Sequence, residues 1–110
     1  MGSQKSDLLQ GTLDLLILKA LLNGTLHGWS ISKRIRQLSR EALMVNQGSL
    51  YPALYRLEDR GWIAGSEAVS PEGRRIRTYR LTAEGRRQLE REVENWRTFS
   101  TAINHVIRSS

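Results

Sequence analysis

The 110-residue chain contains no cysteine, two prolines and few aromatic residues, which make up 6% of it. Without cysteine it can form no disulfide bond, no thiolate metal site and no cysteine nucleophile. Its longest run of large aliphatic residues covers only positions 15–18, between Asp14 and Lys19. A helix that crosses a membrane needs about 20 apolar residues, and no secretory signal pattern is visible. We therefore expect a cytoplasmic protein without a membrane segment.

Acidic residues are also scarce, because 11 Asp and Glu stand against 17 Lys and Arg, for a formal net charge of +6. Of the 17 basic residues, 14 are arginine. The planar guanidinium group offers paired donors that match phosphate oxygens and guanine edges. This balance predicts a nucleic-acid partner, although charge alone leaves open a merely basic and soluble surface.

Groups of residues that could carry out catalysis are missing as well. The two histidines, His27 and His105, fall in different elements, and neither has neighbours at metal-ligand spacing. The acidic residues, such as Glu58 and Asp59, alternate with arginines in a way that indicates surface pairing on helices. No glycine-rich phosphate loop, nucleophile elbow or zinc motif is present. The sequence predicts a protein that is not an enzyme and has no metal or cofactor.

What is present is a series of apolar periodicities. Residues 11–22 are apolar on nearly all sides, which is typical of a central helix or of one covered by a partner. Residues 28–39 and 46–60 each carry one apolar stripe at helical spacing. Asn46 or Ser49 could cap the third helix, and Pro52 is best tolerated if the regular helix begins near Ser49.

After Gly61 the period changes toward two, which predicts strands at 62–68 and 74–81 joined by a turn at 70–73. Thr82 is a good cap for a final helix of about 25 residues. The predicted fold is mainly α with a small β-hairpin, namely a winged helix-turn-helix plus a long C-terminal dimerisation helix. We expect residues 1–7 to be a flexible N-terminus, 8–81 the winged helix-turn-helix DNA-binding domain, and 82–110 the dimerisation helix.

The third helix gives the sharper functional signal. Leu50, Leu54 and Leu57 should face inward, and residues one position earlier in each turn should then lie on the opposite side. Small side chains there would allow close approach to a DNA groove, and arginines could reach phosphates or bases. An ordinary solvated face is the alternative. The DNA-contacting residues predicted on this helix are Asn46, Gln47, Ser49, Tyr51, Ala53, Arg56 and Arg60.

The hairpin adds a second basic element, since four arginines and no acidic residue fall within residues 74–80. Strand pairing would spread them over both faces, where they cannot all be neutralised internally. A basic wing beside a helix-turn-helix suits contact with the DNA backbone or minor groove, whereas solubility explains the cluster less well. Arg74, Arg75 and Arg77 are the predicted contacts.

The final helix has an apolar stripe but no remaining core to cover. Burial against the first helix of a second copy would solve this, and packing back onto its own domain is the alternative. The predicted dimer interface consists of Leu9, Leu13, Leu16, Leu89, Val93, Trp96, Phe99, Ile103 and Val106.

Several of these segments resemble the PadR-type transcriptional regulators. The third-helix signature is Gly48-Ser49-Leu50-Tyr51-Pro52-Ala53-Leu54, followed by Leu57-Glu58 and Gly61-Trp62-Ile63. The end of the wing, Arg77-Thr78-Tyr79-Arg80-Leu81-Thr82 with Gly85, is similar too, as are residues 11–21 and His27-Gly28-Trp29-Ser30-Ile31. Trp29 stands where tyrosine is more usual. The resemblance covers about residues 8–100.

This resemblance implies a cytoplasmic, prokaryotic and dimeric repressor of the short subfamily, with DNA contacts from the third helix and wing. Some members of that group bind flat aromatic compounds between the dimerisation helices. Trp96 falls where such a pocket would form, and it would serve equally well in a dimer core. The interpretation is a homodimeric regulator that binds double-stranded DNA at a two-fold symmetric operator. Whether a small aromatic effector releases it is a question that the sequence leaves open. A winged-helix module that binds protein or structured RNA is the alternative.

Overall fold

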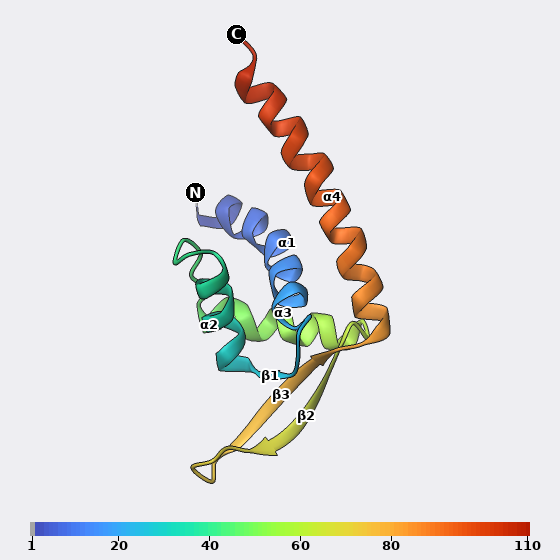
Figure 1. Cartoon of the computed structure of the whole chain (residues 1–110). Coiled ribbons are helices and arrows are strands. Elements are labelled where there is room, and N and C mark those ends of the chain that lie inside the picture. The colour runs from blue at the N-terminus through green and yellow to red at the C-terminus, as the bar shows by residue number, and fades with distance from the viewer. Residues whose placement is uncertain (1) are drawn as a thin grey trace.

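The computed structural model describes residues 2–110, and the side chains of residues 11–110. Three helices pack together, a β-hairpin extends from one side of them, and a long helix leaves in the opposite direction (Figure 1). The elements are α1 (Gly2–Ala20), β1 (Leu26–His27), α2 (Gly28–Leu38), α3 (Gln47–Asp59), β2 (Ile63–Val69), β3 (Arg75–Leu81) and α4 (Ala83–Arg108). The predicted mainly α fold with a small hairpin is confirmed.

Aliphatic side chains from the first three helices and the base of the hairpin form one core. The largest fully buried side chains are those of Ile17, Leu18, Leu21, Ile31, Leu50, Leu54, Leu57 and Ile63. The predicted inward stripe of α3 is confirmed, and the central position of α1 explains why its residues are apolar on nearly all sides. Leu38, at the end of the stripe expected in α2, is instead exposed because α2 ends there.

The boundaries of the helices follow local capping. The Asn46 side chain caps α3, because its Oδ1 accepts a hydrogen bond from the Ser49 amide at 2.9 Å. The helix therefore begins at Gln47, earlier than the start near Ser49 that Pro52 suggested. Pro52 thus lies inside the helix, and because it has no amide hydrogen it leaves the Gly48 carbonyl without that helical hydrogen bond. Gly61 ends the helix at a φ of 78°.

The first helix begins well before the predicted apolar segment. The structure assigns helix from Gly2, so the expected boundary between residues 7 and 8 falls inside α1. That residues 1–7 are flexible, and the division of the chain at residues 8 and 82, stay predictions.

The sheet has three antiparallel strands in the order β1-β3-β2. We call the β2–β3 hairpin, residues 63–81, the wing. Its register runs from Ile63 opposite Leu81 at the base to Val69 opposite Arg75 near the tip. β1 was not predicted, because two residues are too few to show a period, yet it pairs Leu26 with Tyr79 and so ties the wing to the helices.

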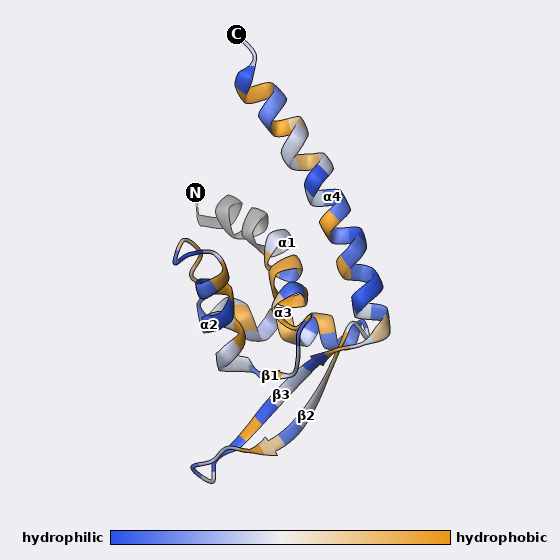
Figure 2. Cartoon of the chain, in the orientation of Figure 1, coloured by the Kyte–Doolittle hydropathy of each residue, from blue (hydrophilic) through white to orange (hydrophobic). Residues whose placement is uncertain are grey.

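The last helix divides into a buried and an exposed part. Thr82 caps it by accepting a hydrogen bond from the Gly85 amide at 3.0 Å. Leu89 is buried and Val93 is half-buried against the body, but beyond them the apolar residues are exposed. We call residues 96–108 the arm. Figure 2 shows apolar residues recurring along it, clear of the rest of the chain.

Candidate nucleic-acid interface

The exposed face of α3 carries two tyrosines. Tyr51 and Tyr55 lie one helical turn apart, and their side chains are 43% and 79% exposed. Gln47 and Pro52 are exposed beside them. Tyrosine offers a flat ring and a hydroxyl donor, so this face can pack against a groove wall and donate to phosphate. Tyr55 was absent from the predicted contacts, although its spacing of four residues from Tyr51 placed both on one side.

Two residues expected on that face lie elsewhere. Ala53 is 0% exposed, and it is part of the core, so it cannot contact DNA. Arg56 turns toward α1, where its Nη2 donates to Oδ1 of Asp14 at 2.7 Å. The residues one position before the leucine stripe are rotated by only about 100° from it, not by half a turn. Packing against α1 covers that side of α3.

The other predicted residues at the two ends of α3 have different surroundings. Asn46 and Gln47 are exposed at its start, and Ser49 is half-buried. Arg60 follows the helix, and its guanidinium carbon lies 5.2 Å from the centroid of the Trp62 ring. Because exposed acidic Asp59 lies beside Arg60, the start of α3 is better suited than its end to lie close to phosphates.

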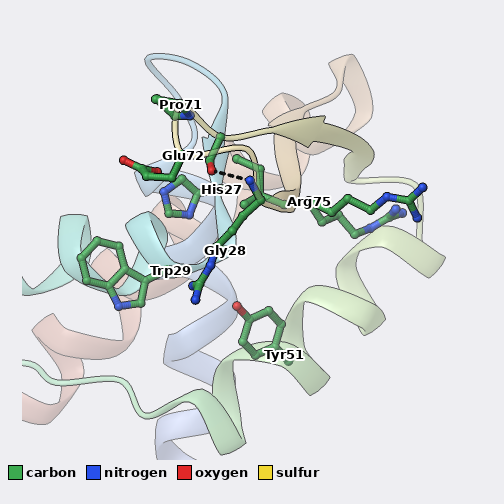
Figure 3. A pocket seen from close by; sticks show the side chains of 11 residues that line it. His27, Gly28, Trp29, Tyr51, Pro71, Glu72 and Arg75 are labelled. Atoms are coloured by element: carbon green, nitrogen blue, oxygen red, sulfur yellow. Dashed lines mark hydrogen bonds between the residues drawn. The ribbon is translucent and has the colours of Figure 1, made fainter.

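A cleft of about 630 Å³ separates the start of α2, the start of α3 and the wing. His27 at the end of β1 and Trp29 at the start of α2 border it, together with Tyr51 from α3 and Arg75 from the wing (Figure 3). The rings of His27 and Trp29 stack with centroids 6.0 Å apart, and Lys33 Nζ lies 5.3 Å from the centroid of the Trp29 ring. Aromatic and basic groups therefore meet at one surface formed by all three elements.

The wing supplies most of the positive charge at this surface. Arg74 and Arg75 are exposed near its tip, and neither forms an ion pair within the part of the chain whose side chains are described. Arg77 differs, because its Nη2 lies 2.6 Å from Oε2 of Glu58 on α3. That carboxylate raises the pKa of the Arg77 guanidinium, so the arginine stays charged. Near the tip of the wing, Arg74 and Arg75 are thus available to a phosphate.

A second hollow, of about 680 Å³, lies between α3 and the wing. Three tyrosines and the Arg77–Glu58 pair line it, together with Asp59. Burial is the main cause that raises the pKa of the Tyr79 hydroxyl above its ordinary value. The residues lining the hollow are Tyr51, Tyr55, Glu58, Asp59, Arg77 and Tyr79.

A third site lies away from the wing, between α1 and α4. This groove of about 490 Å³ is mostly apolar and is lined by Gly11, Thr12, Leu15, Glu92, Asn95, Trp96 and Phe99. Trp96 and Phe99 are 46% and 50% exposed, and their ring centroids are 6.2 Å apart. The predicted aromatic-ligand residue, Trp96, therefore borders a real groove.

The predicted dimer residues fall into three groups. Leu13 and Leu89 are buried in the core of their own chain, so they are not available to a partner. Leu16 and Val93 are half-buried, whereas the residues exposed along the arm are Trp96, Phe99, Ile103 and Val106. Leu9 lies outside the residues whose side chains are described. Across the described part of the chain, no helix combines the length and apolar character that a membrane span requires.

An exposed third helix beside a basic wing defines this chain as a winged helix-turn-helix DNA-binding protein. Residues 17–91 match the model of the transcriptional regulator PadR-like family, so more than half of the chain is covered. The chain belongs to the PadR family, as the sequence predicted. Members of this family are transcriptional regulators and not enzymes.

Two solved structures of transcriptional regulators and one curated regulator are similar to this chain. A transcriptional regulator from Clostridium thermocellum is 31% identical with a TM-score of 0.84, covering 93% of this chain and 99% of that one. A PadR-like regulator from Bacillus cereus is 27% identical with a TM-score of 0.77, covering 94% and 99%. A transcriptional regulator of Mycobacterium tuberculosis is 43% identical over 54 residues, which are 49% of this chain and 50% of that protein.

Proposed function

We propose that the chain is a homodimeric repressor that binds a two-fold symmetric DNA operator. The observation that carries the proposal is the arm, where Trp96, Phe99, Ile103, Val106 and Ile107 expose a continuous apolar stripe. Monomeric proteins rarely leave such a stripe in water, and a second copy provides matching surface because its own arm and α1 carry the same residues. The wing and the arm project in opposite directions, so pairing through the arms leaves the DNA surface open (Figure 1).

The DNA-binding mode follows from the charges around α3. The start of α3 enters the major groove with Asn46, Gln47 and Tyr51, and Tyr55 contacts the groove wall. Arg74 and Arg75 of the wing bind phosphates beside it. The carboxylate of Asp59, which has no ion-pair partner among the described side chains, makes the end of the helix less attractive to phosphates, because carboxylates repel them. A dimer bound in this way represses by occupying promoter DNA.

The groove between α1 and α4 suits a flat aromatic effector. Trp96 and Phe99 provide ring faces for stacking, and Leu15 provides an apolar wall. Because Trp96 and Phe99 belong to the arm and Leu15 to α1, a compound held there alters how α1 and the arm of the two copies pack. That change would alter the distance between the two α3 helices and release the operator.

The operator proposal is tested by mapping protected DNA in the promoter beside the protein's own gene. We expect a protected site with two-fold symmetry, about one helical turn between half-sites, and strongly reduced affinity when one half is scrambled. Sedimentation of the same sample should give the mass of a dimer. A monomer at micromolar concentration would refute the proposal. So would an affinity for scrambled DNA or for structured RNA that equals the affinity for the operator.

Effector binding is tested separately by fluorescence. Flat aromatic compounds should quench the emission of Trp96 in a variant that retains only this tryptophan, and the same compounds should weaken operator binding. A Trp96→Phe variant of the full chain is the matched control. Quenching without any change in operator affinity would contradict the effector role while leaving the operator proposal intact.

A further inference from the structure

The ion pair between Arg77 and Glu58 joins the wing to the recognition helix α3. The Arg77 Nη2 and Glu58 Oε2 atoms are 2.6 Å apart, and the side chains are 44% and 31% exposed. Glu58 lies in the last turn of α3, whereas Arg77 lies on β3, two positions below the tip residue Arg75. The pair therefore connects two elements that must contact DNA together.

The Arg77 side chain is held from two further directions. Its guanidinium carbon lies 5.9 Å from the centroid of the Tyr79 ring, on the same strand. On the other strand, a Cβ atom added to Gly65 would come within 2.7 Å of Arg77 Nη2 and 2.8 Å of its Nε. A side chain at position 65 would therefore displace the guanidinium from its present position. Gly65, Tyr79 and Glu58 together fix its position.

Beyond this point the wing has little else to hold it. Its buried contacts end at Tyr79, and its pairing with β1 ends at Thr78. We call residues 67–77 the outer wing. Within the part of the chain whose side chains are described, Arg77 forms the one ion pair or side-chain hydrogen bond that links the outer wing to a helix. The base of the wing is held by the core and by β1, and this pair adds the contact that links the wing beyond its base to α3.

We propose that Glu58 and Arg77 are positioning residues that set DNA specificity by fixing the wing at one angle to α3. The inference rests on the proposed operator function and assigns Arg77 a role other than its predicted contact with phosphate. An operator requires α3 and the wing to engage base edges and backbone in one register. Non-specific DNA does not require that register, because its binding is mainly electrostatic.

The test is the ratio of operator affinity to non-specific affinity across a salt titration, measured for Glu58→Gln. We expect this ratio to fall roughly fivefold, since exposed ion pairs have modest strength. Asp59→Asn is the matched control, because it removes the neighbouring carboxylate and makes the same change in charge. It should raise both affinities and leave the ratio unchanged.

Two further variants separate positioning from direct contact. Gly65→Ala displaces the guanidinium without changing charge and should lower the ratio in the same way. Arg77→Met should lower the ratio while keeping the salt slope, whereas Arg75→Met should reduce that slope by about one unit. The inference is overturned if Glu58→Gln behaves like Asp59→Asn, or if Arg77→Met loses slope as Arg75→Met does. A wild-type protein without operator preference would instead refute the proposed function.

Discussion

The wing and the arm both project from the same small body, yet their surfaces are opposite in character. The wing exposes Arg74 and Arg75 near its tip beside a single exposed valine, Val69, and its buried apolar residues lie at its base. The arm exposes aromatic and aliphatic side chains along one stripe, from Trp96 to Ile107. A charged projection is stable in water and attracts a polyanion, whereas an apolar projection is stabilised by removal from water. These opposite characters agree with the proposal that the wing binds DNA and the arm binds a second copy.

The largest effect should come from placing a charge in the arm. Trp96→Asp puts an unpaired carboxylate into the apolar seam, so the dimer should dissociate and operator affinity should fall by more than about 100-fold. Thr98→Asp adds the same charge off the stripe and should leave both unchanged. Sedimentation and operator titration on one sample check the result. A monomeric Trp96→Asp variant with full operator affinity would show that the arm is not needed for DNA binding.

Removing charge from the wing should produce the next largest effect. The double variant Arg74→Ala with Arg75→Ala should weaken binding to every DNA sequence and reduce the salt slope by about two units, one for each lost phosphate contact. Arg97→Ala, on the arm side of the molecule, is the control with one arginine removed. Titrations at several salt concentrations measure the slope. An unchanged slope would remove the wing from the interface.

A smaller and sequence-dependent effect is expected at the start of α3. Gln47 is exposed at the first position of the helix, where a side-chain amide can pair with an adenine edge. Gln47→Ala should cost about 1–3 kcal/mol against the operator and little against unrelated DNA. Gln37→Ala, on α2, is the matched control. Equal losses on both DNAs would mean that Gln47 does not recognise a base.

The Arg56–Asp14 pair should affect stability rather than DNA recognition. Its atoms are 2.7 Å apart and its side chains are 32% and 21% exposed. Arg56→Ala should lower the free energy of unfolding by about 1 kcal/mol in urea, with Asp14→Asn behaving alike and the double variant adding little. If Arg56→Ala instead changed the base preference of DNA binding, the prediction that Arg56 contacts DNA would be supported.

The smallest effect is alkaline destabilisation through Tyr79. Burial raises the pKa of this hydroxyl above its ordinary value of 10.0, so the folded state favours the protonated form. Its contribution to stability is complete below pH 10 and is lost as pH rises through the higher pKa of the folded state. Urea unfolding should show a smaller alkaline loss in Tyr79→Phe than in the wild type. Tyr55→Phe, which removes an exposed hydroxyl, should retain the wild-type loss.

Features governed by local periodicity were predictable from the sequence. The leucine stripe of α3, the hairpin and the Thr82 cap each depend on neighbours within a few residues. The exposed side of α3 was not predictable in the same way, because the position of α1 decides which side is covered. Ala53 and Arg56 therefore appeared available for DNA, while Tyr55 was left out.

Contacts between distant residues gave no sequence signal at all. Asp14 and Arg56 are 42 residues apart, and Glu58 and Arg77 are 19 apart. A single sequence contains many charges that could pair at such separations, and only the packing of the elements selects among them. The helix and the strand that carry Arg56 and Arg77 were therefore predictable, whereas the ion pairs of these two arginines were not.

The hydroxyl of Thr82 has a consequence for how far apart two half-sites can lie. It donates to the Gly61 carbonyl at 2.7 Å while it accepts from the Gly85 amide. Gly85 fits beside the Trp62 carbonyl because it has no Cβ atom, which would lie only 1.9 Å from that oxygen. One junction thus joins the end of α3, the last strand and the start of α4. In a dimer held by the arms, the inclination of α4 at this junction sets the separation of the two α3 helices. Substitutions here would change the number of base pairs that a preferred operator places between its halves, even where the affinity for each half is retained.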